Sequence, residues 1–343
     1  MPFVTSAIPI VDTAGLSRTD WLDYRRTGIG GSDLAAIMGL SGFGTARDIY
    51  YSKISELDAV DTDDENWFAK EYGNALEPLA VKTFEKMYDL DAFVVHKMFR
   101  HPVHEFMIAD VDGFVNEDAG SISILECKST GTFNREAWEN GAVPYNYELQ
   151  CRHYMAVMNL DRAYIICIMG NTLSDVYVRV IERDMEIEAA IIQEEKYFWE
   201  EHVLKRSPIP YTENGDLVLK SIRKHYGATH SAAYTLGKPA LVHLDEYLKL
   251  KEQKRDLDAQ VKDVDNKMKK AYAPVLDLMR NSPSANCIGA KAEYLSSNNS
   301  VVRKQISGDS LEKLRIRHPD IYREYLTESE SRRFSVKVKE LAI

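Results

Sequence analysis

Residues 108–128 read IADVDGFVNEDAGSISILECK, and this stretch decides the fold. Apolar residues recur at alternate positions on both sides of the turn-forming segment 116–120, which is typical of two antiparallel strands joined by a hairpin. A turn centred near residue 118 pairs residues whose numbers sum to roughly 237. The pattern therefore predicts that Asp112 lies opposite residues 124–126.

This hairpin would gather three charged side chains at one end of the sheet. Alternate residues of a strand share a face, so Glu126 and Lys128 lie on one face and Cys127 points the other way. The carboxylates of Asp112 and Glu126 repel each other unless a cation lies between them. Oxygen ligands of this charge suit Mg²⁺ or Mn²⁺, and the backbone carbonyl of Cys127 would face the same ion. Lys128 is placed to orient or deprotonate a water.

Flanking residues add groups that match such a site. Glu77, on a predicted helix, could complete a metal shell. Gln150 and Tyr154 are four residues apart on another predicted helix, so they share a face and could hold a DNA backbone or a metal-bound water. The alternative is a solvated hairpin with ordinary surface charges on it and on the two helices. The strongly apolar strand around Glu126 argues against that alternative, because buried carboxylates seldom lack partners.

A glycine-rich turn near the N-terminus offers an anion site. Residues 26–33 read RTGIGGSD and precede a predicted helix, whose N-terminal amides attract anions. Ser32 and Asp33 are suitable N-caps for that helix. Arg26 and Ser32 could hold a terminal phosphate. A dinucleotide-binding loop is excluded, because the spacing is GxGG instead of GxGxxG and the preceding DYRR does not resemble a strand.

The surrounding pattern predicts an α/β (α+β) core with a mixed central sheet flanked by helices, in a first domain over residues 1–210. Beyond the helix–turn–helix that contains the glycine turn, the predicted elements are helices over 66–89, 145–159 and 183–205, and strands over 92–101, 105–116, 121–129, 163–170 and 176–183.

Residues 211–343 form a predicted C-terminal extension, with a long helix over about 241–280 and a small α/β tail. Two sets of apolar residues repeat every seven positions in this helix: Leu250, Leu257, Val264 and Ala271, and Val261, Met268 and Val275. Such a repeat is typical of a coiled coil or a helical hairpin. Between 241 and 270, 8 basic and 7 acidic residues nearly balance, so the segment suits helix contacts better than phosphate binding.

Composition narrows the class of protein. The net charge of −10 argues mildly against nucleic-acid binding, although a nuclease needs acidic metal ligands and only a local basic track. No apolar run approaches the ~18–20 residues of a membrane span, and the N-terminus does not resemble a signal peptide. The four cysteines show no zinc spacing. We expect a soluble protein of the reducing cytoplasm.

The chain resembles the YqaJ-like viral recombinase nucleases, relatives of the phage lambda exonuclease and of the RecB-type nuclease domain in the PD-(D/E)XK superfamily. The matching segments are RRTGIGGSDLAAIMG, YGNALEPLAVKTFE, IADVDGF, LECKS and ELQCRHYM, in the family's order. The resemblance implies a restriction-endonuclease-like core and an exonuclease that uses one or two Mg²⁺ ions, with Mn²⁺ as a substitute. It would digest linear double-stranded DNA 5′→3′ and leave 3′ single strands for recombination.

The same resemblance implies partners and an origin. The 3′ strand would be taken up by a single-strand annealing protein of the RecT or Beta type. The enzyme would be a homo-oligomer, for which a ring is one possible form, in a bacterial host cell with a phage or prophage as its source. Two alternatives stay open: a non-catalytic assembly or DNA-binding protein of recombination, and an endonuclease of the same fold.

Site roles follow from the resemblance as well. Asp112, Glu126 and the Cys127 carbonyl would bind metal, with Glu77 as a further ligand, and Lys128 would activate water. Gln150 and Tyr154 match the family's Q-x-x-x-Y helix, and Arg26, with Ser32 nearby, would bind the 5′ phosphate. Asp110, two residues before Asp112 on the same face, could share its role.

Overall fold

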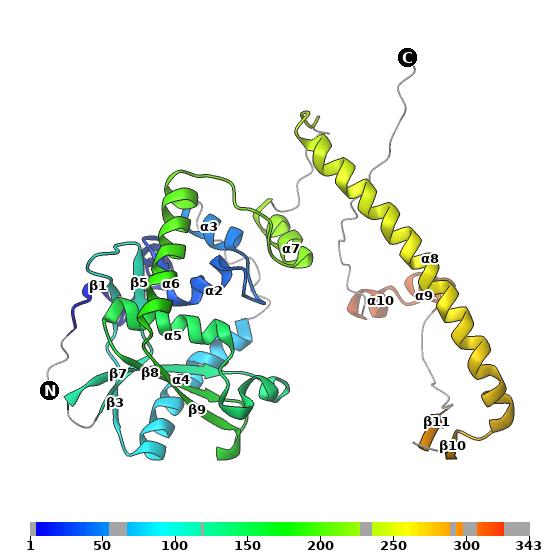
Figure 1. The fold of residues 1–343 in the computed structure, drawn as a ribbon, viewed down its shortest axis with the longest axis horizontal. Coiled ribbons are helices and arrows are strands. Elements are labelled where there is room, and N and C mark those ends of the chain that lie inside the picture. The colour runs from blue at the N-terminus through cyan, green and yellow to red at the C-terminus, as the bar shows by residue number, and fades with distance from the viewer. Residues whose placement is uncertain are drawn as a thin grey trace. The chain divides into compact units, whose positions relative to one another are not determined.

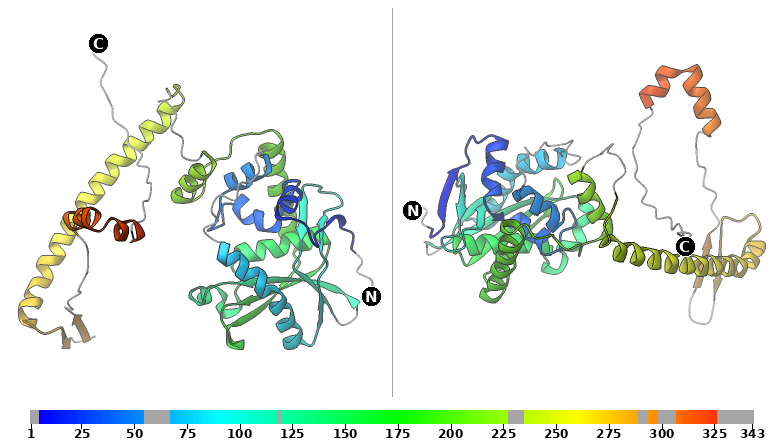
Figure 2. Two further views of the ribbon diagram at one scale, coloured as in Figure 1. Left: turned by 180° about the vertical axis from the view of Figure 1, so that it is seen from behind. Right: turned by 90° about the horizontal axis from the view of Figure 1, so that it is seen from above.

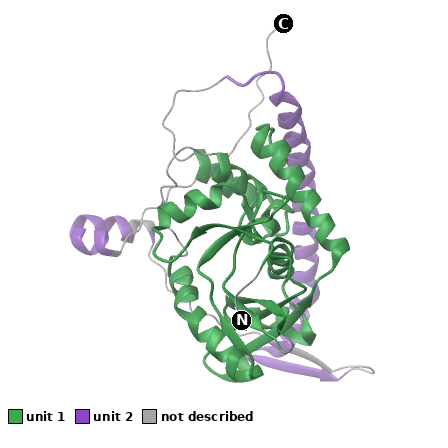
Figure 3. Cartoon of the chain, turned by 90° about the vertical axis from the view of Figure 1, so that its left-hand side faces the viewer, with its two compact units in different colours: residues 1–230 green, residues 231–343 purple. Residues whose placement is uncertain are grey.

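The chain divides into two compact units, residues 1–230 and residues 231–343 (Figure 3). The computed structural model describes residues 5–54, 67–117, 120–226, 235–288, 293–297 and 307–325. The predicted boundary at residue 210 falls before α7 (Gly215–Tyr226), which belongs to the first unit. In α7, His225 stacks on Tyr51 of α3 (Ala46–Ile54), so this helix is tied to the first unit.

The first unit is built around a five-stranded sheet in the order β3-β6-β7-β8-β9 (Figure 1). Its strands are β3 (Asp91–Phe93), β6 (Gly113–Asn116), β7 (Ile122–Ser129), β8 (Arg162–Ile168) and β9 (Val176–Glu182). The central β7 and β8 run parallel and the other neighbours run antiparallel. The predicted mixed sheet is confirmed.

A second sheet has the order β1-β4-β5-β2. Its strands are β1 (Ile8–Asp12), β4 (Lys97–Arg100), β5 (Met107–Asp110) and β2 (Ile29–Gly30). The predictions of single strands over 92–101 and 105–116 are therefore wrong, because each range is divided between the two sheets. Both halves of 105–116 are buried, so apolar residues continue through the whole range. The sequence therefore does not indicate where the chain passes from one sheet to the other.

The hairpin that the sequence predicts is present between β6 and β7. Gly113 pairs with Leu125 and Asn116 pairs with Ile122, so the register differs from the predicted one by a single residue. Residues 118 and 119 of the turn lie outside the described part of the chain. Extended by one step, this register places Asp112 beside Glu126, where the chain has just left β5 and not yet entered β6.

Helices cover both faces of the five-stranded sheet. Phe114 and Ile124 point toward α5 (Tyr145–Met158), whereas the alternate residues Val115 and Leu125 point toward α4 (Trp67–Tyr88). The side chain of Phe84 on α4 is fully buried. Burying each such side chain contributes about 1.5–3 kcal/mol. Two cores, one on each face, thus hold β7 in place.

The predicted helix–turn–helix is present as α1 (Arg18–Arg26) and α2 (Gly31–Ile37). The expected N-caps Ser32 and Asp33 are wrong, because Gly30 is the N-cap. Asp33 instead lies in the first turn and accepts a hydrogen bond from the Gly30 N–H at 3.0 Å. The predicted helix over 183–205 is α6 (Met185–Tyr197) followed by a π-helical segment, Phe198–Leu204.

The second unit contains one long helix, α8 (Ala240–Met279), as the sequence predicts (Figure 2). An antiparallel hairpin of β10 (Ser284–Ile288) and β11 (Glu293–Ser297) follows it. Helices α9 (Gly308–Arg317) and α10 (Pro319–Tyr325) follow. The last residues of the predicted α/β tail, 326–343, lie outside the described part of the chain.

Candidate active site

A cavity of about 540 Å³ opens where the two sheets meet at Asp112. Its lining contains three carboxylates as well as basic and hydroxyl groups. The lining residues are Thr13, Leu16, Ser17, Arg18, Trp21, Arg25, Ser32, Asn74, Glu77, Val94, Val95, His96, Asp110, Val111, Asp112 and Tyr154. A chamber with both kinds of group can accept a cation together with an anion such as phosphate.

The acidic part of the cavity consists of Glu77, Asp110 and Asp112. Glu77 comes from α4, where Pro78 follows it inside the helix. Burial, together with the nearby charges of Asp112 and Asp110, raises the pKa of Glu77 to about 7. Burial also raises the pKa of Asp112. These carboxylates therefore lie close enough to disfavour one another's charged forms.

Glu126 lies deeper, and its side chain is fully buried in β7. Its Oε1 accepts hydrogen bonds from the Lys128 ammonium and, at 2.6 Å, from Gln150 Nε2. Its Oε2 has no hydrogen-bond partner among the described residues. Burial and the charge of Asp112 raise the pKa of Glu126 to about 8. A buried carboxylate oxygen without a partner is costly, so this position suits a ligand that the protein itself does not supply.

Lys128 and Cys127 complete this end of β7. The Cys127 N–H donates to Asp112 Oδ2 at 2.9 Å, so the Asp112 side chain takes the place of a strand partner there. The Cys127 side chain packs on the α4 face, opposite to Glu126, as the alternation predicts. Burial lowers the pKa of Lys128, but Glu126 and Asp112 raise it by more, and the net shift is upward. Lys128 is therefore a cation in this arrangement.

Gln150 and Tyr154 lie on the face of α5 that is turned toward Glu126. Gln150 Nε2 donates to Glu126 and also lies 3.2 Å from the Tyr154 hydroxyl. Tyr154 reaches the cavity itself. The structure thus brings together the side chains of Asp112, Glu126, Lys128, Gln150 and Tyr154, and the charge of Glu77 acts on this cluster.

The residues of this cluster fit a divalent cation. Among the described residues, no group of three His, Cys, Asp or Glu side chains is already close enough to hold a metal. However, the charges of Glu77, Asp112 and Glu126 disfavour one another, and Glu126 Oε2 lacks a partner. A hard cation would relieve the repulsion and supply that partner.

The basic part of the cavity comes from α1 and α2. Arg25 and Ser32 line it, and Arg25 Nη2 donates to Ser32 Oγ at 3.2 Å. Arg26, which the sequence singled out, is not among the lining residues, and its Nη1 donates to Asp23 at 2.7 Å. The sequence analysis named Arg26 alone, whereas of these two adjacent residues of α1 it is Arg25 that lines the cavity.

Arg25 is held from behind by a buried ion pair that the sequence did not indicate. Asp33 Oδ1 lies 3.1 Å from Arg25 Nη2, and Asp33 Oδ2 lies 2.8 Å from Lys53 Nζ. Lys53 also donates to the Arg25 carbonyl at 2.9 Å. Gly30 leaves the space for the guanidinium, because a Cβ there would lie 1.4 Å from Arg25 Nη1. This network orients Arg25 toward the cavity.

Two further residues of the cavity were missed in the sequence. Trp21 Nε1 donates to Asp110 Oδ2 at 2.7 Å, which fixes that carboxylate on the wall. The Arg18 guanidinium carbon lies 4.5 Å from the centre of the Trp21 ring, a cation–π distance. Apolar and basic residues at helical spacing on α1 were the only signal for these roles.

A buried His–Glu pair joins the helices behind the site. His153 Nδ1 lies 2.6 Å from Glu195 Oε1, and His153 Nε2 lies 2.9 Å from the Ile108 carbonyl oxygen. Burial lowers the pKa of His153, but the carboxylate and the carbonyl raise it by more, because both ring nitrogens face acceptors. This pair ties α5 and α6 to β5.

Comparison with known proteins identifies the domain that contains this site. The model of the YqaJ-like viral recombinase domain matches residues 20–161, which include Glu77, Asp110 and Asp112 of the acidic part and Arg25 and Ser32 of the basic part. Over these residues the chain is similar to the YqaJ-like viral recombinase domain family. The uncharacterized protein YqaJ of Bacillus subtilis (strain 168) is 29% identical over 325 residues, which are 94% of this chain and 95% of that protein. Its similarity therefore includes most of the second unit.

Two solved structures are similar to about half of this YqaJ-like protein. An alkaline exonuclease from Laribacter hongkongensis is 20% identical, with a TM-score of 0.45, and the match covers 55% of this chain and 96% of the exonuclease. A phage related exonuclease from Haemophilus somnus 129PT is 16% identical, with a TM-score of 0.38, and covers 55% of this chain and 100% of its own. The predicted α/β architecture, a mixed sheet flanked by helices, is confirmed by the strand order and the helices on both faces. No helix of the described residues is long and apolar enough to cross a bilayer.

Proposed function

We propose that this YqaJ-like protein is a Mg²⁺-dependent exodeoxyribonuclease that digests linear double-stranded DNA from 5′ ends. The observation that carries the proposal is the cavity, which combines the carboxylates of Glu77, Asp110 and Asp112 with Arg25 and Ser32. Phosphodiester hydrolysis requires groups that hold a divalent cation and groups that hold a phosphate. The similarity of residues 20–161 to the YqaJ-like viral recombinase domain is a second ground for the proposal.

Asp112, Glu126 and Glu77, with the Cys127 carbonyl, would hold Mg²⁺, for which Mn²⁺ is the expected substitute. The ion would supply Lewis-acid stabilisation of the charge that develops on the phosphate. Lys128, which the carboxylates keep protonated, would bind the scissile phosphate or orient the attacking water as a hydrogen-bond donor. Gln150 and Tyr154 would position that water through Glu126.

Arg25, with Ser32, would bind the terminal 5′ phosphate. Its guanidinium lies in the cavity, whereas that of Arg26 pairs with Asp23. This assignment replaces the sequence-based choice of Arg26 within the same motif. A terminal phosphate held at a fixed distance from the metal ligands would define which phosphodiester is cut.

The remaining parts of the proposal concern the setting of the reaction. Digestion 5′→3′ would leave 3′ single strands for a single-strand annealing protein of the RecT or Beta type. We place the enzyme in the cytoplasm of a bacterial host, with a phage or prophage as its source, and as a homo-oligomer. The family's recombinase description supports this setting.

End-labelled linear duplex DNA tests the central claim. We expect loss of label only with Mg²⁺ or Mn²⁺, faster from 5′-phosphate than from 5′-hydroxyl ends. Glu126→Gln and Asp112→Asn should abolish turnover and keep the cooperative unfolding transition. Glu186→Gln, an exposed carboxylate on α6, is the matched control and should keep full activity. Undiminished digestion by a protein that carries both Asp112→Asn and Glu126→Gln would refute the assignment.

The same substrates separate the two alternatives. An endonuclease of this fold would nick covalently closed circular DNA, which an end-dependent enzyme leaves intact. A non-catalytic DNA-binding protein would retard the duplex in a gel without shortening it at any metal concentration.

A further inference from the structure

Helix α8 of the second unit exposes a continuous apolar row to solvent. Leu250, Leu257, Val261, Val264 and Met268 are 57%, 59%, 59%, 52% and 59% exposed. Scattered apolar side chains on a surface are ordinary, but a contiguous row along one helix marks a contact surface. The proposed nuclease reaction uses none of these residues, so the row requires its own explanation.

The row follows a heptad register throughout the helix. The first core set, at position a, is Ala240, Tyr247, Lys254, Val261, Met268 and Val275. The second, at position d, is His243, Leu250, Leu257, Val264, Ala271 and Leu278. A β-branched residue at a with leucine at d, as at Val275 and Leu278, favours a two-stranded parallel coiled coil. Contact with a partner that has no matching helix would not require apolar residues at this seven-residue repeat.

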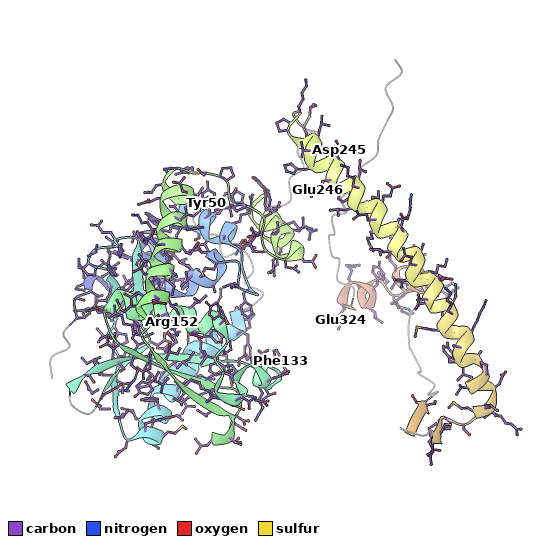
Figure 4. The ribbon with its side chains drawn as sticks, in the orientation of Figure 1. Tyr50, Phe133, Arg152, Asp245, Glu246 and Glu324 are labelled. Atoms are coloured by element: carbon purple, nitrogen blue, oxygen red, sulfur yellow. The ribbon has the colours of Figure 1, made fainter. Side chains whose placement is uncertain are left out.

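Charged residues beside the seam identify the partner. Glu246 is at position g and Lys251, five residues later, is at position e of the next heptad. In a parallel pair of identical helices these two positions face each other across the interface, and they do so twice by symmetry. Figure 4 labels Glu246 near the start of α8. The following g and e′ positions combine Gln253 with Asp258, so no like charges meet there.

Within a single chain these two residues have no ion pair among the described residues, although their neighbours do. Lys254 pairs with Asp258 at 3.0 Å along the helix. Lys267 pairs with Asp263 at 2.6 Å in the same way. Glu246 and Lys251 are thus left as a complementary pair that a second copy in register would join.

We propose that α8 forms a parallel, in-register coiled coil with α8 of a second copy of this chain. Lys254 would lie at the edge of the seam, with its aliphatic stem packed between the helices and its ammonium on Asp258. A single lysine at an a position lowers stability but restricts register and number of strands. The coiled coil joins chains through the extension and does not depend on what the nuclease cavity does.

The mass of the full-length protein in solution, measured by light scattering, tests the interface. Leu257→Glu with Val264→Glu places two charges in the seam, seven residues apart. Ala259→Glu with Asn266→Glu places the same charges seven residues apart on the outward face, and is the matched control. We expect wild type and control at an even multiple of 39.1 kDa and the seam variant at half of that mass. Equal helical circular dichroism in all three proteins shows that α8 itself persists.

A wild-type mass of one chain would overturn the proposal, as would equal masses of the seam variant and the control. Either result would show that another protein or another part of this chain covers the row. The mass measurement needs neither DNA nor metal, so it tests the coiled coil even if the nuclease assignment fails. Conversely, the digestion assay would detect a nuclease that forms no coiled coil.

A charge exchange tests the parallel direction. Lys251→Glu alone would set two glutamates against each other twice, and we expect a dimer dissociation constant raised roughly tenfold. Glu246→Lys combined with Lys251→Glu restores the opposite charges and should return the constant to the wild-type value. In an antiparallel pair g faces g and e faces e, so failure of the second substitution to rescue the first would refute the parallel arrangement.

Discussion

Asp33→Asn provides the most quantitative test of how the site is built. The Asp33 carboxylate bridges Arg25 and Lys53 at 3.1 and 2.8 Å. Burial raises its pKa, but Arg25 and Lys53 lower it by more, from 3.8 to about 2. A tenfold change in an acid dissociation constant corresponds to about 1.4 kcal/mol, so the lowered pKa means that the ionised Asp33 carboxylate contributes about 2 kcal/mol to folding at pH 7.

The substitution also leaves Lys53 without its carboxylate. The Lys53 side chain is 3% exposed, and burial already lowers its pKa, an effect that Asp33 opposes. Removing one partner of a buried pair costs about 3–5 kcal/mol in measured cases. We therefore expect Asp33→Asn to lower the free energy of unfolding by about 2–4 kcal/mol at pH 7.

Urea unfolding of both proteins across a pH series measures this loss. A lowered folded-state pKa stabilises the protein above the unfolded value of 3.8, and this contribution disappears as the pH falls toward 2. The difference between wild type and Asp33→Asn should thus be constant near neutrality and shrink between about pH 4 and pH 2. Asp23→Asn, which breaks the exposed pair with Arg26, is the control and should cost less than about 1 kcal/mol. A loss equal to the control's at pH 7, or one unchanged at pH 2, would refute the reasoning.

Three further outcomes are expected. Gly30→Ala should keep the fold but displace the Arg25 guanidinium, so the rate ratio for 5′-phosphate over 5′-hydroxyl ends should fall severalfold; an unchanged ratio contradicts the role of Arg25. The raised pKa of His153 stabilises the fold fully below pH 6.5 and loses this contribution above it, so the stability gap to His153→Gln, followed by urea unfolding, should narrow as the pH rises. Trp138→Ala empties a fully buried position and should cost about 3–5 kcal/mol by thermal unfolding; a loss under 1 would contradict its core role.

The local sequence patterns predicted where the acidic cluster lies in the fold. Apolar alternation and the turn composition predicted the hairpin to within one residue, and the helical spacing of Gln150 and Tyr154 predicted their common face. These features depend on residues close together in the chain, where periodicity reflects burial directly. The heptad repeat predicted α8 for the same reason.

What the sequence did not reveal depends on distant contacts. The division of 105–116 between two sheets has no local signature, because both halves are buried. The choice between Arg25 and Arg26 depends on the phase of α1 against α2, and the role of Lys53 depends on α3 reaching Asp33. Propensity and spacing do not determine such long-range placements.

Asp112 lies on the two-residue link between β5 and β6, so its placement in the site depends on both sheets. The link can present its carboxylate beside Glu126 only while both sheets keep their mutual alignment. Heat or denaturant that loosens either sheet should therefore abolish the proposed activity before most of the helices unfold. As the protein unfolds, the proposed nuclease activity would thus be lost before the helical circular dichroism signal.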